Sequence, residues 1–319
     1  MKKSTFAGAL LALAAVTQPV QAQPYPSKVI RMVVPFPPGG GFDGIARPVA
    51  EKMGAFLGQA IVLDYRPGAG GNIGIEHAAK AVADGYTILV ANVSMTSNPA
   101  IWKSINYDPV TDFAPIARIG SASSALAVHP SVKAKDLKEL RMVAKAKPLN
   151  FASPGVGTSS HLIGEMMNLE GILHLVHIPY KGTAPAVTDA LGGQLDAIMV
   201  PLVSLAPHIR AGKLRGIAVS SAQRVAMMPD LPTFAESGFP QVQSDTWYAL
   251  FAPAGTPQPI LSRLYEAAVH AVAQPDVAER LKGAGYDAGT SSPEVLGALV
   301  KSEIARWNKM ATDAKIPKQ

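Results

Sequence analysis

A glycine-rich turn at the start of a predicted helix is the first stretch of this chain whose residue types suggest chemistry. It reads Pro-Phe-Pro-Pro-Gly-Gly-Gly over residues 35–41, directly after an apolar, β-branched run at 29–34 that is typical of a buried strand. Glycine can adopt positive φ and lets a ligand approach the main chain, and a helix that begins here presents unpaired N–H groups. Residues 35–41, which we call the first elbow, therefore predict an anion site, although a tight turn without a ligand fits the same residues.

Two further turns of this kind follow predicted strands. One spans residues 66–74 after a strand at 60–63, and the other spans residues 153–161 after a strand at 149–152. We call residues 153–161 the second elbow, because the order of strand, Pro/Gly turn and helix repeats that of the first elbow. Lys181 also follows a strand and precedes a helix, so it either steers a ligand or is a solvent-exposed surface charge.

The chain lacks the sequence signatures of common enzymes. It has no G-x-S-x-G nucleophile turn, no G-x-x-x-x-G-K-[ST] phosphate loop, no intact G-x-G-x-x-G after a strand, and no cysteine. His161 beside Ser159 and Ser160 leaves an exported hydrolase as an alternative. His174 and His177 lie three residues apart on a predicted strand and so point to opposite faces, which disfavours a metal site. We therefore expect no catalytic residue, no metal and no cofactor.

The first residues have the pattern of a secretory signal peptide. A basic start at 1–3 precedes an apolar run at 6–16 and Val-Gln-Ala at 20–22, which predicts cleavage after Ala22 and a periplasmic protein. Without cysteine, the exported fold must rest on its core and not on disulfides. The formal net charge is +6 and no basic stripe alternates with aromatic residues, so nucleic-acid binding is not expected.

Strands and helices alternate in two sets, which predicts an α/β fold with two parallel-rich sheets covered by helices. The first set ends in a polar segment at 92–99, which we expect to be a loop at the carboxyl edge of the sheet. Two extended pieces, at 112–119 and 125–128, mark one crossover between domains, and residues 247–252 mark the return. The predicted organisation is a signal peptide (1–22), the first part of domain 1 (23–124), domain 2 (125–247), and a return crossover with C-terminal helices that pack on domain 1 (248–319).

Many short motifs occur in register over the whole mature chain. They comprise residues 33–40 with Asp43 and 46–47, then 66–74, 84–87, 107–109, 112–115, 157–161, 179–182 and 251–257. Together they resemble the Bug-type extracytoplasmic solute receptors of tripartite tricarboxylate transporters. The resemblance implies a two-domain Venus-flytrap receptor that closes on a small carboxylate and delivers it to the membrane components of a transporter. A ligand-sensing receptor of a signalling system is the alternative, and a monomer is expected in either case.

The resemblance also implies how the carboxylate is held. Main-chain amides and ordered waters, and not an arginine clamp, bind its oxygens. Carried over by position, the contacts in the first domain come from Phe36, Pro37, Pro38, Gly39 and Gly40, with help from Asn72, Ser94 and Met95. Those in the second domain come from Ser153, Gly155, Val156, Gly157, Thr158, Ser159, Ser160 and His161, and Phe42 and Lys181 complete the candidate set.

Three departures from the family pattern bear on the ligand. Phe42 stands where relatives commonly have Thr or Ser, Val156 stands where many have Asn, and residues 200–203 lack an Asp-Asn pair found near there in relatives. Each change removes a polar group from the expected cleft, and an ammonium buried without a partner is costly. The sequence therefore predicts a preference for carboxylates without an amine, either a dicarboxylate or an aromatic or apolar monocarboxylate.

Overall fold

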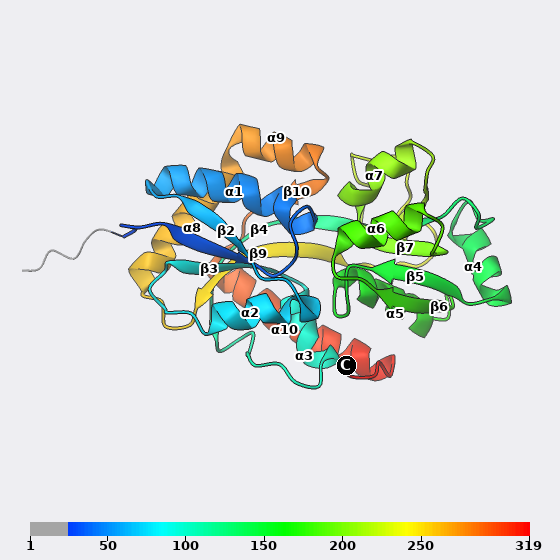
Figure 1. Cartoon of the computed structure of the whole chain (residues 1–319), viewed down its shortest axis with the longest axis horizontal. Helices are drawn as coiled ribbons and strands as arrows, with labels where there is room; N and C mark the ends of the chain where they lie inside the picture. Colours follow the sequence, from blue (N-terminus) through cyan, green and yellow to red (C-terminus); the bar gives the residue numbers. More distant parts are fainter. Residues whose placement is uncertain (1–24) are drawn as a thin grey trace, which may run out of the picture.

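The computed structural model describes residues 25–319, so the predicted leader and its cleavage after Ala22 lie outside the described residues. Within this range ten strands form one sheet in the order β2-β1-β3-β9-β4-β7-β5-β6, with β8 and β10 paired to β4 (Figure 1). The strands are β1 (Ile30–Val34), β2 (Ile61–Tyr65), β3 (Thr87–Asn92), β4 (Phe113–Val128), β5 (Leu149–Ser153), β6 (Leu175–Pro179), β7 (Ala197–Pro201), β8 (Arg215–Val219), β9 (Asp245–Pro253) and β10 (Tyr286–Ala288).

Helices cover both faces of this sheet. They are α1 (Gly41–Leu57), α2 (Asn72–Ala79), α3 (Ser94–Ile101), α4 (Leu137–Ala146), α5 (Ser159–Leu169), α6 (Thr183–Leu191), α7 (Leu202–Arg210), α8 (Gln258–Ala273), α9 (Pro275–Gly283) and α10 (Pro293–Asp313). No helix between residues 25 and 319 is long and apolar enough to cross a membrane.

The long strand β4 belongs to both halves of the sheet. Its residues up to Ser123 pair antiparallel with β9, and those from Ser124 onward pair with β7 and β8. We call residues 25–123 together with 245–319 the first lobe, and residues 124–244 the second lobe. We propose these lobes as the two domains of the protein, and the domain bounds expected from the sequence stay a prediction.

Each lobe has an apolar core on both faces of its half of the sheet. In the first lobe α1, α8 and α9 cover one face and α2, α3 and α10 the other, whereas in the second lobe α4 and α5 lie opposite α6 and α7 (Figure 1). Parallel strands β1, β5 and β6 each lead directly into a helix. Since such helices begin at the carboxyl ends of their strands, α1, α5 and α6 all start at the edge where ligands bind in α/β folds.

The crossover and the sheets differ in detail from the sequence-based expectation. Residues 113–128 form one continuous strand and not two extended pieces, because the middle of β4 pairs with both β9 and β10. The two predicted parallel-rich sheets join into one sheet, in which β1, β2 and β3, and likewise β5, β6 and β7, pair parallel, whereas β7, β8 and β9 pair antiparallel with β4.

Residues 94–101 form helix α3, so the prediction of a polar loop at 92–99 was wrong. Asn92 stabilises the turn into this helix, because its Oδ1 accepts the N–H of Ser94, the first helical residue, at 3.0 Å. Two of the buried polar side chains that suggested a loop bond to distant segments: Ser97 Oγ donates to the carbonyl of Gly157 at 2.5 Å, and Asn98 Nδ2 donates to Asn72 Oδ1 at 2.7 Å.

A glycine sets the height of α5 above the sheet. A Cβ on Gly164 would lie 2.2 Å from Cζ of the buried Phe151 ring on β5. We expect Gly164→Ala to lower the free energy of unfolding by about 1–3 kcal/mol, because the overpacked helix must move. The matched control is Gly297→Ala inside α10, where the nearest atom to the new Cβ is 3.8 Å away. There alanine should raise stability by up to about 1 kcal/mol. Urea unfolding measures both, and equal effects would contradict this packing.

Candidate functional site

Three helices of the described chain begin at one cavity between the lobes. The cavity has a volume of about 60 Å³ and is lined by the first elbow, the start of α5, the start of α6, and side chains of β3 and β9. This volume is small beside the roughly 300–1,000 Å³ of pockets for drug-sized ligands. The site therefore suits a molecule of few atoms.

Each of the three helices leaves two main-chain N–H groups open at this cavity. The residues that line the cavity and whose N–H groups have no acceptor in the part of the chain that the structure describes are Gly41 and Phe42 of α1, Ser159 and Ser160 of α5, and Thr183 and Ala184 of α6. The third position of each helix offers no further donor. The N–H of Asp43 bonds to Gly40 O at 3.0 Å, the N–H of His161 bonds to Thr158 Oγ1 at 3.4 Å, and Pro185 has no N–H.

The electrostatics of the cavity favour an anion. Three helix N-termini carry the positive ends of their dipoles to the same place, and each such end stabilises a nearby anion by about 0.3–1 kcal/mol. Lys181 is the only charged side chain among the cavity-lining residues of the described chain, and it is otherwise exposed. No carboxylate of the described residues lines the cavity to oppose an anion.

Side-chain hydroxyls complete the second-lobe wall. Ser159 Oγ lies 2.5 Å from Thr246 Oγ1 on β9, and Ser160 Oγ lies 3.2 Å from Ser124 Oγ on β4. Both serines are thus tied to the two strands that connect the lobes. This arrangement gives neither serine a histidine partner of the kind a hydrolase needs.

Asp43 holds the first elbow in shape. Its carboxylate accepts the N–H of Gly39 at 2.8 Å, the O–H of Tyr65, and a guanidinium N–H of Arg47 at 3.3 Å. Burial raises the pKa of Asp43, but these hydrogen bonds and the Arg47 charge outweigh it, so the pKa lies below the ordinary value. The N–H of Gly39 is therefore occupied, which corrects the expectation that it binds the ligand directly.

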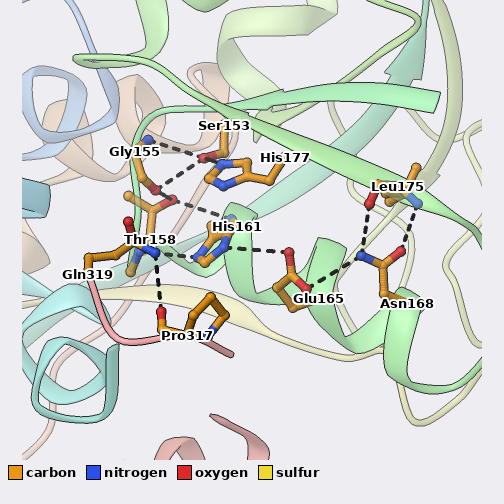
Figure 2. Close-up of polar contacts among 11 residues, drawn as sticks. Ser153, Gly155, Thr158, His161, Glu165, Asn168, Leu175, His177, Pro317 and Gln319 are labelled. Atoms are coloured by element: carbon orange, nitrogen blue, oxygen red, sulfur yellow. Dashed lines mark hydrogen bonds and ion pairs between the residues drawn. The ribbon is translucent and has the colours of Figure 1, made fainter. Parts of the chain in front are cut away.

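A buried histidine supports the second elbow from behind (Figure 2). The N–H of Gly157 donates to His161 Nδ1 at 3.2 Å, and His161 Nε2 lies 3.6 Å from Glu165 Oε1. The His161 ring stacks on that of His177 at 4.1 Å, and His177 Nε2 lies 2.6 Å from Ser153 Oγ. Burial lowers the pKa of His161 to about 4, so at neutral pH it is an uncharged acceptor. His161 thus shapes the elbow and does not line the cavity.

Contacts between the lobes surround Gly157. This glycine has φ of +81°, and a Cβ on it would lie 2.1 Å from Asn98 Oδ1 of α3. Similarly, a Cβ on Gly70 would lie 2.4 Å from the carbonyl oxygen of Val156. The first and second lobes therefore touch closely here, where glycines allow the main chains to approach.

The structure brings half of the predicted site residues to the cavity. Those that line it are Phe36, Pro37, Pro38, Gly40, Phe42, Thr158, Ser159, Ser160 and Lys181. Those that lie elsewhere are Gly39, Asn72, Ser94, Met95, Ser153, Gly155, Val156, Gly157 and His161.

The residues away from the cavity have structural contacts that explain their places. Met95 is fully buried in the core of the first lobe, where it packs with the residues of α10. Asn72 Oδ1 accepts hydrogen bonds from Asn98 and from the hydroxyl of Tyr107 at 2.9 Å. Ser153 and Gly155 bond to each other, through Ser153 Oγ and the main chain of Gly155. These contacts explain why such residues lie away from the cavity, and their part in ligand binding stays a prediction.

Sequence reasoning missed several residues that line the cavity. They are Gly41, Asn92, Pro154, Gly182, Thr183, Ala184, Pro185, Pro201, Thr246 and Tyr248. The turn at 181–185 could have been predicted as part of the site, because it follows a strand and leads into a helix as the two elbows do. Thr246 and Tyr248 could not, since alternation along β9 does not reveal which face meets the cavity.

Comparison with known proteins shows the family of the chain. Residues 45–315 match the family described as "Tripartite tricarboxylate transporter family receptor". The chain belongs to this family. It is 36% identical to Protein BugT of Bordetella pertussis over 304 residues, which cover 94% of this chain and 93% of BugT, so the Bug-type resemblance is confirmed.

Two solved structures with bound carboxylates are similar to the receptor. "R. palustris Rpa4515 with adipate" has a TM-score of 0.88 at 31% identity and covers 92% of this chain and 100% of that one. MatC of Rhodopseudomonas palustris "with bound malate" has a TM-score of 0.84 at 32% identity and covers 90% of this chain and 99% of that one. The predicted α/β periplasmic-binding-protein fold is thus confirmed, and the family is one of periplasmic solute-binding receptors, not of enzymes.

The buried histidines predict a loss of stability in mild acid. Burial lowers the pKa of His161 to about 4, and burial together with His161 lowers that of His177 to about 2. Between about pH 6.5 and 4 the unfolded chain therefore binds more protons than the folded chain. The free energy of unfolding falls as the pH drops through this window, by at most about 1.4 kcal/mol per pH unit for each histidine. Glu165 opposes part of this loss, because burial raises its pKa.

Urea unfolding at pH 7 and pH 5 measures this effect. His161→Asn keeps an acceptor for the N–H of Gly157 but does not titrate, so it should lose clearly less stability on acidification than the wild type. The control His174→Asn changes an exposed histidine outside the network and should behave as the wild type. Equal stability of the wild type at both pH values would refute the prediction.

Proposed function

We propose that this protein is a periplasmic receptor that captures a small organic carboxylate without an amine between its lobes. Main-chain N–H groups at the starts of α1, α5 and α6 hold the carboxylate oxygens, and Lys181 attracts the anion toward the cavity. The observation that carries the proposal is the meeting of three helix N-termini at a cavity whose lining contains one lysine and, among the described residues, no acid.

The donors are sufficient in energy for a useful affinity. A hydrogen bond to a charged group contributes about 1.5–3 kcal/mol, and each helix end adds about 0.3–1 kcal/mol. Micromolar binding corresponds to about −8 kcal/mol after the costs of ordering and association have been subtracted. A few of the six open N–H groups therefore suffice without an arginine clamp.

The lining of the cavity supports a ligand without an amine. An ammonium needs carbonyl or carboxylate partners, because a buried unpaired charge costs several kcal/mol. The cavity instead presents N–H donors and the aromatic rings of Phe36 and Phe42, which stack at 5.2 Å. The similar receptors are recorded with adipate and malate, both carboxylates without an amine.

We further propose that the receptor acts as a monomer after cleavage at Ala22 and delivers its ligand to the membrane components of a tripartite tricarboxylate-type transporter. Membership of the receptor family supports this role over a sensor for a signalling system. Deleting the gene distinguishes the two: transport predicts lost uptake of the ligand, whereas sensing predicts lost induction with uptake intact.

Calorimetric titration of ligand-stripped protein tests the ligand class. Succinate and aspartate form a matched pair, because they differ only in the amine. We expect succinate to bind at least about tenfold more tightly, a difference of about 1.4 kcal/mol. Glutamate and benzoate extend the comparison to a longer amine and to an aromatic acid. Tightest binding to aspartate or glutamate would overturn the proposed ligand class.

Two glycines with the same backbone conformation test the role of the first elbow. Gly39 has φ of +80° and Gly58, at the far end of α1, has φ of +72°, and an added Cβ meets nothing within 4 Å at either position. Alanine should cost each about 1–2 kcal/mol of stability, because an L-residue is strained there. Only Gly39→Ala should also weaken carboxylate binding, by about tenfold, because strain at Gly39 shifts the first turn of α1. Unchanged binding by Gly39→Ala would argue against the elbow.

A further inference from the structure

Tyr248 places a buried hydroxyl at the cavity. It lies on β9 between the lobes, its side chain is only 1% exposed, and it lines the cavity. Its ring meets Phe42 edge to face, with centroids 5.1 Å apart and an interplanar angle of 89°. The adjacent Trp247 packs into the core on the opposite face of the sheet. Alternation along the strand thus gives Tyr248 the cavity side.

No residue between 25 and 319 hydrogen-bonds to the hydroxyl of Tyr248, and this oxygen borders the cavity and is not sealed in the core. Its neighbour Tyr286 is different, because the O–H of Tyr286 donates to the carbonyl oxygen of Gly41 at 2.6 Å. A polar group that opens into a cavity needs an acceptor there, which can be a water or a ligand oxygen.

The start of α1 is shaped around this hydroxyl. A Cβ on Gly41 would lie 2.6 Å from Tyr248 Oη and 3.4 Å from Pro201 Cγ. Glycine at position 41 therefore keeps open the space next to Tyr248 Oη, on the first-lobe side of the cavity. The open N–H groups of Ser159 and Thr183 lie on the second-lobe side.

We infer that Tyr248 determines specificity by donating its O–H to an oxygen at one end of the ligand, while the starts of α5 and α6 hold a carboxylate at the other end. The ligand class is then a short aliphatic acid with a second oxygen group, such as a dicarboxylate. This inference rests on the proposed function. Aromatic and proline side chains of Phe42, Pro37 and Pro201 line the cavity and suit the hydrocarbon between the two ends. Burial raises the pKa of Tyr248 well above its ordinary value, so it remains a neutral donor.

The test compares succinate with butyrate, which has the same chain length and a single carboxylate. Calorimetric titration of ligand-stripped wild type should give a succinate affinity at least about tenfold above that of butyrate. In Tyr248→Phe the succinate affinity should fall by about tenfold, and the butyrate affinity should stay within about twofold. The ratio of the two affinities thus approaches one in the variant.

Tyr286→Phe is the matched control, because it removes the same atom from the neighbouring ring. It breaks the bond to Gly41 O and should change both affinities by the same factor, which leaves their ratio as in the wild type. Melting temperatures verify that both variants are folded. The inference is overturned if wild type binds butyrate as tightly as succinate, or if Tyr248→Phe keeps the wild-type ratio. If wild type binds none of succinate, malate, adipate and butyrate, the proposed function itself fails.

Discussion

Unpaired main-chain N–H groups at helix starts are the constraint on which the site depends. Every α-helix leaves such donors, and a protein must satisfy them with caps, water or a ligand. In α1, α5 and α6 the third residue offers no free N–H, whereas the N–H groups of the first two residues remain open at the same cavity. The sheet brings the starts of the three helices to one cavity, and Asp43 and Thr158 fix the turns that precede two of them. Anion binding is thus a property of the backbone, and the side chains around it adjust selectivity.

The same arrangement explains why uncharged groups support the second elbow. His161 accepts the N–H of Gly157 without carrying a charge, because burial keeps it neutral. Two residues of α3 contact the second elbow across the interface between the lobes. Ser97 donates a hydrogen bond to Gly157 O, and Asn98 packs against Gly157. Neutral partners thus position the donors of the second elbow. The first elbow is held by the Asp43 carboxylate, which is paired with Arg47 and does not line the cavity.

The sequence predicted the features that local residue types determine. Proline and glycine after predicted strands located both elbows, and the extended pieces predicted at 112–119, 125–128 and 247–252 overlap strands β4 and β9. The sequence-based predictions failed where a particular hydrogen-bond partner, near or distant in the chain, determines the structure. Helix α3 looked like a loop because its buried Ser97 and Asn98 are satisfied by residues on other segments. Gly39 looked like a ligand contact, yet the Asp43 side chain takes its N–H. Tyr248 was missed since periodicity separates the two faces of a strand without identifying the one that meets the cavity.

Strand β9 has a consequence for the order in which the chain folds. It lies between β3 and β4 in the sheet of the first lobe, yet it comes after the whole of the second lobe in the sequence. All strands of the second lobe fall within residues 124–219 and pair with one another. A chain that emerges from its N-terminus can therefore complete the second lobe while the first still lacks a central strand. Until residue 253 is available, β3 and β4 have unpaired edges that invite association with other chains.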